Sequence, residues 1–341
     1  MEPLSRIVSI TPNDPSQTGN ARRQAQSLAL AMDFDELRQG QLGIIVTEAA
    51  RNIAAHAVQG EIILSPWSYE GIAGIDMLAL DKGQGIENVS AAMEDGYSTA
   101  GTPGNGLGAI SRLASTFQVY SSSSNAPGGN GTAIFARVLR TAHDTESESH
   151  PYDMSAITIP ISGETVCGDA WSAVRGPGRS LYIVADGLGH GPSAAEAAEE
   201  ALRIFHLVSQ FEPDRILSEI HSALAKTRGA AVSVAEILHE KHELRYAGAG
   251  NIVGVICSGG KTRSLVSMNG TVGHAVGKIQ QFSYPWQPES ALIMHSDGLA
   301  TRWNVEQYPG LASRHPALLA GVLFRDFCRK RDDATILVSR I

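Results

Sequence analysis

The stretch that decides the fold is SLYIVADGLGHG, residues 180–191. An apolar run of strand length ends at Asp186 and Gly187, and an alanine-rich segment of helical character follows from Ser193 to Ser209. A carboxylate at the end of a strand, next to a glycine, offers oxygen ligands to a hard cation. Because an Asp-Gly pair after a strand is also a common turn, this stretch needs support from the rest of the chain.

The same pattern recurs in the C-terminal half. Asp297 follows the apolar run of ALIMHSDG, Asp332 lies just before the final run, and Asp169 ends VCGD. Several carboxylates at strand ends form a ligand set that suits Mg²⁺ or Mn²⁺. Two such ions about 4 Å apart can activate a bridging water for attack on a phosphate. The pattern predicts a two-metal hydrolytic site that requires no covalent nucleophile.

The C-terminal half also has many strand-like runs around one pair of helices, the second from about Pro213 to Thr227. GAAVSVAEIL, HELRYAGAGNIVGVIC and DDATILVSRI are the clearest of these runs. Many strands with two adjacent helices predict a β-sandwich with helices outside.

Taken in order, VCGDAW, VADGLGHG, LIMHSDG and RDDAT resemble the SpoIIE/RsbX branch of the metal-dependent, PPM-type serine/threonine phosphatases, over residues 153–341. The resemblance implies that Asp186 bridges two Mg²⁺ or Mn²⁺ ions, with the Gly187 carbonyl as a further ligand. It implies catalytic roles for Asp186 and Asp297. The other metal ligands that it implies are Asp169, Asp297 and Asp332.

The chain departs from this family pattern at three places. Nothing in SGETVCGDAW supplies the arginine that holds phosphate in many relatives, so we expect the metals to carry most of that role. His190 is displaced from the usual position and is equally well explained as a turn residue. Asp333 stands where many relatives have asparagine, and His295 is expected to be a core histidine.

In the N-terminal half, Glu48, Asn52 and His56 are spaced i, i+4 and i+8 within a predicted helix, which places them on one stripe. A buried polar stripe is unfavourable unless a ligand satisfies it, and a nucleotide with Mg²⁺ would do so. Asn52 could coordinate Mg²⁺, and Glu48 could act as a base. The alternative is an exposed helix face that contacts only water.

Asp81 ends the strand-like run MLALD and is followed by Gly83 and Gly85. Its carboxylate can accept a hydrogen bond from the exocyclic amine of adenine. The loop GTPGNGLG, residues 101–108, then opens a helix and offers backbone N–H groups to phosphates. It is neither a Walker A loop nor a Rossmann fingerprint.

TEAARNIAAHA, LALDKGQGI, GNGLGAISRLASTF and GNGTAIFARV resemble the GHKL ATPase/kinase superfamily, and more narrowly its RsbT/RsbW serine kinases, over residues 5–140. The resemblance implies the Bergerat ATP fold, an α/β sandwich, with one Mg²⁺ bound beside ATP at Asn52. It makes Glu48 the catalytic base. The remaining nucleotide-binding residues that it implies are Asp81, Gly104, Gly106 and Thr132.

The sequence therefore predicts an α+β protein in three parts. These are an ATP-binding domain at residues 1–140, a linker at 141–153 and a phosphatase domain at 154–341. With 43% hydrophobic and 18% charged residues, each half can form a packed core.

Charge and cysteine usage narrow the function classes. A net charge of −8 without a basic block argues against nucleic-acid or anionic-membrane partners. The three cysteines are too few and too widely spaced for a disulfide framework. No apolar run reaches the roughly 20 residues of a membrane span, and no signal peptide is recognised, so we expect a cytoplasmic protein.

The two resemblances together imply a bacterial partner-switching regulator. Its phosphatase half would dephosphorylate phosphoserine or phosphothreonine on a STAS-type regulatory protein, and its ATP-binding half would act as a serine kinase. Two alternatives stay open. The ATP-binding half could be a non-catalytic sensor or an anti-sigma-type binding module that gates the phosphatase, or the phosphatase could act on small phosphoesters.

Overall fold

A computed structural model of the protein describes residues 5–12, 14–69, 71–93, 106–122, 128–141, 153–176 and 178–340. The chain divides into two compact units. The N-terminal unit comprises Ser5–Pro151 together with Val305–Arg325, and the C-terminal unit contains Tyr152–Asn304 and Asp326–Ile341. Apart from its two end residues, the predicted linker at 141–153 lies outside the described residues.

The N-terminal unit is a five-stranded antiparallel sheet, in the order β1-β2-β3-β5-β4, with helices packed on it. Its longer elements are β1 (Arg6–Ile10), α1 (Pro15–Ala31), α2 (Glu36–His56), β2 (Gly60–Tyr69), β3 (Ile72–Asp81), α3 (Val89–Ala92), α4 (Gly106–Leu113), β4 (Thr116–Ser122), β5 (Gly131–Leu139) and α7 (Pro316–Phe327).

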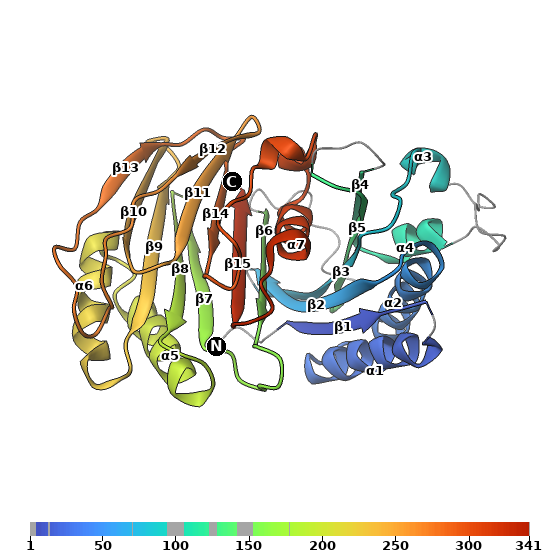
Figure 1. Ribbon diagram of the computed structural model, residues 1–341, viewed down its shortest axis with the longest axis horizontal. Helices are drawn as coiled ribbons and strands as arrows, with labels where there is room; N and C mark the ends of the chain where they lie inside the picture. Colours follow the sequence, from blue (N-terminus) through green and yellow to red (C-terminus); the bar gives the residue numbers. More distant parts are fainter. Residues whose placement is uncertain are drawn as a thin grey trace. The chain divides into compact units, whose positions relative to one another are not determined.

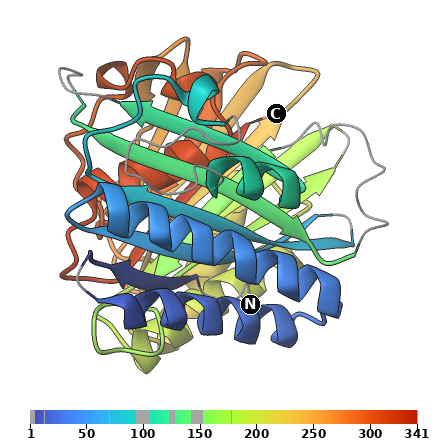
Figure 2. The ribbon, with the colours of Figure 1, turned by 90° about the vertical axis from the view of Figure 1, so that its right-hand side faces the viewer.

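Helices α1 and α2 lie side by side across one face of this sheet (Figure 2). Each begins at an aspartate that accepts a backbone N–H in its first turn: Asp14 for α1 and Asp35 for α2. Side chains alternate along a strand, and Met77 and Ala79 of β3 pack into the core beneath these helices. The helix that carries the predicted Glu48 stripe is therefore fixed against the sheet.

Helix α7 covers the opposite face of the same sheet. Leu78 and Leu80 alternate with the core residues of β3, and both lie within 3.3 Å of the position that a Cβ would take on Gly321. The ring of His315, just before α7, stacks on Phe135 with centroids 4.1 Å apart. Helices therefore cover both faces of the sheet at β3 and β5.

The C-terminal unit is a sandwich of two five-stranded antiparallel sheets (Figure 1), with strand orders β13-β10-β9-β8-β7 and β12-β11-β14-β15-β6. Its elements are β6 (Asp153–Ile159), β7 (Asp169–Gly176), β8 (Arg179–Gly187), α5 (Pro192–Leu207), α6 (Pro213–Ala223), β9 (Ala230–Leu238), β10 (Glu243–Ala249), β11 (Val253–Ser258), β12 (Lys261–Ser264), β13 (Phe282–Pro285), β14 (Ala291–His295) and β15 (Ala334–Arg340).

Two apolar layers hold this unit together. Tyr182, Tyr246 and Leu337 belong to the core between the sheets. Ile183 and Phe205 belong to a second layer, between the first sheet and helices α5 and α6. The predicted α+β class, with a β-sandwich and outer helices in the C-terminal half, is confirmed.

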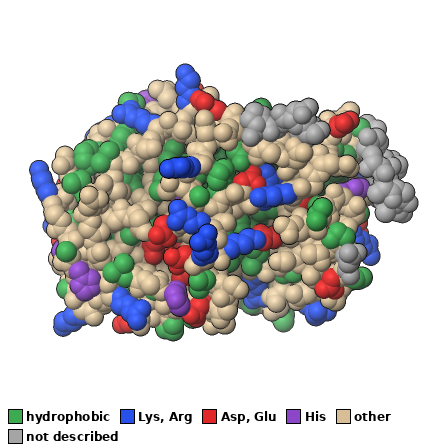
Figure 3. Space-filling model, viewed as in Figure 1, with side chains coloured by type: hydrophobic (Ala, Val, Ile, Leu, Met, Phe, Trp, Pro, Cys, Tyr) green, Lys and Arg blue, Asp and Glu red, His purple; other side chains and the backbone are tan. Residues whose placement is uncertain are grey.

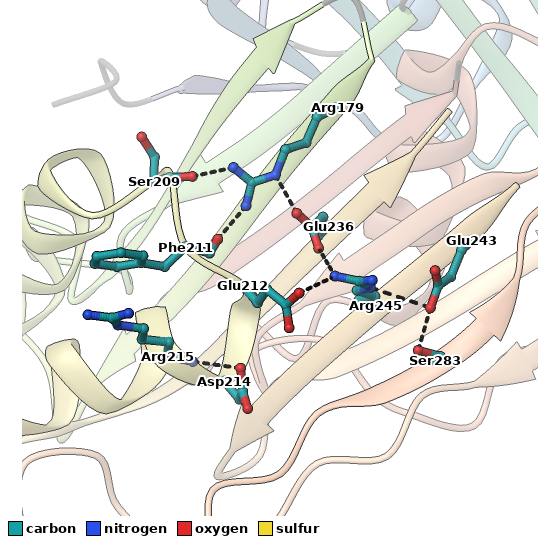
Figure 4. Close-up of polar contacts among 10 residues, drawn as sticks. All are labelled: Arg179, Ser209, Phe211, Glu212, Asp214, Arg215, Glu236, Glu243, Arg245 and Ser283. Atoms are coloured by element: carbon teal, nitrogen blue, oxygen red, sulfur yellow. Dashed lines mark hydrogen bonds and ion pairs between the residues drawn. The ribbon is translucent and has the colours of Figure 1, made fainter. Parts of the chain in front are cut away.

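A charged network ties the α5–α6 turn to the first sheet (Figure 4). The Arg179 guanidinium donates to the Ser209 and Phe211 carbonyls and to the buried carboxylate of Glu236. Arg245 contacts the same carboxylate from β10. Glu236 is thereby paired with two arginines, which offsets the cost of burying its charge.

Basic and acidic side chains are interspersed on the face drawn in Figure 3. Within the described ranges, no helix is both long enough and apolar enough to cross a membrane.

Candidate functional site

The register of β7 and β8 places Asp169 directly opposite Asp186. Tyr182 and Val184 of β8 point into the sandwich core. Because side chains alternate along a strand, Asp186 points to the same side at the end of that strand. The two carboxylates therefore face the interior at one end of the sandwich.

The second sheet brings its aspartates to the same end. Leu337 of β15 packs in the core, and Asp333 lies on the same side of the chain just before that strand. Its Oδ1 accepts from the Ile161 N–H and its Oδ2 from the Gly168 N–H, both at 2.7 Å. Asp333 thus ties the segments that lead to β15 and β7 together, and both of its oxygens are already used.

These aspartates lie close enough to one another for their charges to raise carboxyl pKa values within the group. Burial first, and then the negative charges of Asp169, Asp297, Asp332 and Asp333, raise the pKa of Asp186 to about 9. Burial also raises the pKa of Asp169 to about 7, against a hydrogen bond from Ser296. The carboxyl pKa of Asp297 is raised by burial and by Asp332. A bound cation would offset the repulsion between the negative charges of such a cluster.

Two polar side chains that the sequence did not single out hold these carboxylates. The Ser296 hydroxyl donates to Asp169 Oδ2 at 2.6 Å, and the Asn251 amide donates to Asp297 Oδ2 at 2.7 Å. Ser296 could have been noticed because it precedes Asp297 directly. Asn251 lies in the turn between β10 and β11, far from Asp297 in sequence, and no local pattern marks it.

Glycine is required at position 187 by close packing. A Cβ there would lie 2.0 Å from the Ala194 carbonyl oxygen, in the first turn of α5. The adjacent Leu188 N–H donates to the Gly229 carbonyl at 3.0 Å. The loop that follows Asp186 is therefore held on both sides, and the predicted Gly187 lies beside the carboxylate cluster.

The cluster suits a hard cation in its chemistry, since it offers carboxylate oxygens and buried negative charge. Within the described ranges, no three carboxylate, imidazole or thiol groups converge closely enough to form a complete metal cage. Carbonyl oxygens and waters would have to complete each coordination shell. The residues fit such ions, because a cation would offset the repulsion between the carboxylates around Asp186. Part of each coordination shell would then come from ligands other than carboxylates.

The histidines near the site have other tasks. His190 is exposed and its Nδ1 lies 3.1 Å from a Glu164 carboxylate oxygen. His295 is fully buried, and burial lowers its pKa to about 4. As a neutral ring it donates from Nδ1 to the Ser296 carbonyl and accepts from the Trp303 indole. It is a core histidine, as expected.

One arginine lies near Asp297, and another lies beside the loop that follows Asp186. Arg329 is close enough to Asp297 to lower its carboxyl pKa, opposing the effect of burial. The Arg228 Nη1 lies 3.2 Å from the position that a Cβ would take on Gly189. Neither guanidinium is paired with another described residue. The sequence analysis missed both, because neither lies in the motif where relatives carry their arginine.

The predicted residues of the ATP site fall into two groups, both in the N-terminal unit. In the first, Gly106 at the start of α4 lies against α2. A Cβ on Gly106 would be 3.1 Å from Asn52 Oδ1 and 3.5 Å from Glu48 Oε2. Glu48 and Asn52 are partly buried, and Glu48 also pairs with Arg51 at 2.8 Å. The stripe is therefore not a plain solvent-exposed face, except at His56, which is exposed.

The second group surrounds Asp81 at the end of β3. Its Oδ1 accepts from the Gly83 N–H at 2.7 Å and from the Thr132 N–H at 3.2 Å. Its Oδ2 has no hydrogen-bond partner among the described residues. Burial raises the pKa of Asp81, with Arg325 opposing that shift. A half-buried carboxylate with one unsatisfied oxygen suits the exocyclic amine of adenine.

Gly85 is a further predicted residue, and it follows Asp81 closely along the chain. Gly85 has a φ of +78°, a conformation that favours glycine. Gly104 lies outside the described residues, as does the rest of the predicted phosphate loop before Gly106.

Comparisons with known proteins match two different parts of the chain. The Histidine kinase-like ATPase domain matches residues 11–136, and Stage II sporulation protein E (SpoIIE) matches residues 176–341. The serine/threonine-protein kinase RsbT of Bacillus subtilis (strain 168) is 34% identical over 116 residues, which cover 34% of this chain and 84% of RsbT.

The chain belongs to the RsbT family. Its second half carries a SpoIIE domain of the PP2C type. Among solved structures, RsbX in complex with magnesium is 21% identical, with a TM-score of 0.49, over 57% of this chain and 96% of that one. A SpoIIE fragment from Bacillus subtilis, with its PP2C phosphatase domain, is 19% identical, with a TM-score of 0.48, over 96% and 97%. The assignment rests on the sequence matches.

Proposed function

We propose that this RsbT-family protein is a cytoplasmic partner-switching regulator with two opposed activities. The C-terminal unit removes phosphate from phosphoserine or phosphothreonine on a STAS-type regulatory protein. The N-terminal unit binds ATP and phosphorylates a serine or threonine on a protein of the same kind. The observation that carries the proposal is the repulsive carboxylate cluster around Asp186, because such a cluster costs stability unless cations bind to it.

When bound, two Mg²⁺ or Mn²⁺ ions would supply an activated water and offset the charge of the phosphate. Asp186 would be the ligand that the two ions share, with the Gly187 carbonyl as a further ligand. Asp297 and Asp332 would hold the second ion, and Asp169 the first or its water shell. Ser296 and Asn251 keep two of these carboxylates in place through the hydrogen bonds that they donate.

Arg228 and Arg329 would bind the phosphate oxygens of the substrate. Arg329 lies near Asp297, Arg228 lies beside Gly189 in the loop that follows Asp186, and both side chains are exposed. A guanidinium matches a phosphate in geometry and charge. They would take over the role of the arginine that is missing from the first motif.

In the N-terminal unit, Asn52 would coordinate the Mg²⁺ that accompanies ATP, and Asp81 would accept a hydrogen bond from adenine. Glu48 would take the proton of the attacking hydroxyl. Gly106 would belong to the phosphate lid, with Gly104 before it. The contact between Gly106 and the Asn52 side chain supports this arrangement.

A second function for the N-terminal unit is a non-catalytic nucleotide sensor. The Glu48 carboxylate is engaged by Arg51 at 2.8 Å, which competes with its use as a base. In that case ATP would bind, and the unit would gate the phosphatase or sequester a partner without transferring phosphate.

A cycle assay tests both activities with the full chain and a STAS-domain protein. ATP with Mg²⁺ should phosphorylate the STAS protein, and Mn²⁺ without ATP should release that phosphate. Glu48→Ala should remove only the first activity and Asp186→Ala only the second. ATP binding without transfer by the wild type would select the sensor function, and release that survives Asp186→Ala would reject the phosphatase site.

A further inference from the structure

The segment Val305–Arg325 connects two strands of the C-terminal unit, β14 and β15, but it belongs to the N-terminal unit. Besides the stacking of His315 on Phe135, the His315 N–H donates to Gln118 Oε1 of β4 at 2.9 Å. Residues 316–324 of α7 are all buried. This part of the SpoIIE half is therefore built into the ATP-binding fold.

Arg325, near the end of α7, reaches the base of the predicted adenine site. Its Nη1 donates to the backbone carbonyl of Asp81 at 2.9 Å. Gly131 makes this approach feasible, because a Cβ there would lie 2.8 Å from the Arg325 Nη1 and 2.1 Å from the Asp81 oxygen. Gly131 also has a φ of +140°, so two constraints favour glycine at this contact.

The hydrogen bond from Arg325 is the third that holds Asp81 in place. Arg325 fixes its carbonyl, while the N–H groups of Gly83 and Thr132 fix its Oδ1. Only Oδ2 is left without a partner among the described residues. A rigid carboxylate with one free oxygen discriminates better between hydrogen-bond donors than one that can rotate.

We propose that Arg325 is a positioning residue of the nucleotide site, supplied by the SpoIIE half, which holds Asp81 so that the site selects adenine. This inference rests on the proposed binding of ATP at Asp81. Arg325 acts through Asp81 and does not touch the nucleotide. Short connections lead from Asp297 to Val305 and from Arg325 to Asp332, so the segment that supports the adenine site also joins two predicted metal ligands.

The test compares the binding of ATP and ITP to the full chain by calorimetry. ITP carries an oxygen in place of the exocyclic amine and keeps the ribose and phosphates. In the wild type we expect ATP to bind about tenfold or more tightly than ITP, and Asp81→Asn should abolish that preference. Arg325→Gln should weaken ATP binding about tenfold and leave ITP binding within about twofold. Arg325→Lys, which keeps the charge but only one nitrogen donor, should give an ATP/ITP ratio between those of Arg325→Gln and the wild type.

Arg314→Gln is the matched control, since it removes the same charge from an exposed position in the same segment. Equal loss of ATP and ITP binding in Arg325→Gln, or no loss, would overturn the role of Arg325. If Arg325→Gln does not fold, the ATP/ITP ratio of Arg325→Lys decides: a ratio below that of the wild type supports the proposal, and an unchanged ratio overturns it. A wild type that binds no nucleotide, or whose preference survives Asp81→Asn, would overturn the proposed ATP site itself.

Discussion

The two candidate sites differ in how far the protein itself balances their charge. Around Asp186 several carboxylates face one another, and the pKa of Asp186 rises to about 9 because burial and repulsion both oppose its ionisation. Around Asp81 the protein satisfies one carboxylate oxygen with two N–H groups and the carbonyl with Arg325. Under the proposed function, a bound cation would supply both stability and chemistry at the first site. The second is already ordered and needs only a ligand for one oxygen.

The largest effect is expected when the ATP-binding site is separated from the rest of the chain. A fragment that ends at residue 141 lacks α7 and uncovers Leu78, Leu80 and Phe135. Burial of each large apolar side chain is worth about 1.5–3 kcal/mol, which together approaches the total stability of about 5–15 kcal/mol of a typical domain. We expect the fragment to aggregate or to lose cooperative unfolding, as measured by circular dichroism.

The control for this fragment carries residues 305–327 on a flexible linker after residue 141. It should regain a cooperative transition, because α7 can cover the exposed face again. A fragment 1–141 that unfolds as cooperatively as the control and binds ATP equally well would contradict the assignment of α7 to the N-terminal unit.

The next largest effects are expected at Asp186, where one substitution should lower activity and raise the stability of the metal-free protein. Asp186→Asn should reduce phosphate release by about 10³-fold and should also raise the melting temperature of the metal-free protein by a few degrees. The asparagine side chain has nearly the same volume as aspartate but no negative charge, so the repulsion with the neighbouring carboxylates is lost. Phosphate release from a phosphoserine peptide and a thermal melt with EDTA measure the two effects.

The stability of the metal-free wild type should also depend on pH in a defined direction. In the unfolded chain the Asp186 carboxyl ionises near 3.8, and in the folded chain only near about 9. Between these values the folded state holds a proton that the unfolded state has lost, so stability falls as pH rises. Asp186→Asn should flatten this slope between pH 5 and 9, and an unchanged slope would place its cause elsewhere.

A smaller change is expected at the ordered site. Asp81→Asn keeps the shape of the side chain but replaces one carboxylate oxygen, an acceptor, by an NH₂ group, a donor. ATP affinity should therefore fall about ten- to hundredfold. Fluorescence titration with a labelled ATP analogue measures it. Asp33→Asn, the same change at an exposed position, is the control. Equal affinities for the two variants would exclude Asp81 from nucleotide binding.

The smallest effect is expected at Asn251, which donates a hydrogen bond to the predicted metal ligand Asp297. Asn251→Ala removes the amide that orients Asp297, and a loss of this kind costs about tenfold in metal affinity. The Mn²⁺ concentration for half-maximal phosphate release should rise by that factor, with little change at saturating Mn²⁺. Asn269→Ala, at an exposed position of the same unit, should leave the Mn²⁺ requirement unchanged.

Much of the fold followed from local patterns. The Asp-Gly pairs at strand ends and the spacing of Glu48 and Asn52 are short-range features, and the comparisons confirm the two family resemblances that they suggested. The partnerships of Asn251 and Arg325 could not be predicted, because they join residues far apart in the chain. A local sequence pattern does not predict which loops lie next to one another at the end of a β-sandwich.

The place of α7 illustrates the same limit. Its apolar sequence predicts a buried helix, but not the sheet that it covers. The apolar runs MLAL of β3 and AIFA of β5 did carry a signal, since a stretch of strand that is apolar on both faces is expected to be covered on both. The covering helix lies almost two hundred residues further along the chain, between the predicted metal ligands Asp297 and Asp332.

The central claim is that the cluster around Asp186 is a cation site, and a Mn²⁺ titration by calorimetry at pH 7.5 tests it most directly. Repeating the titration in buffers with different ionisation enthalpies measures the protons released. The wild type should bind two ions and release about one proton, because Asp186 is protonated before the metal binds. Asp186→Asn should lose most of the binding and the proton release. Wild-type protein that binds no Mn²⁺, or a variant that binds it with the same affinity and proton release, would contradict the account.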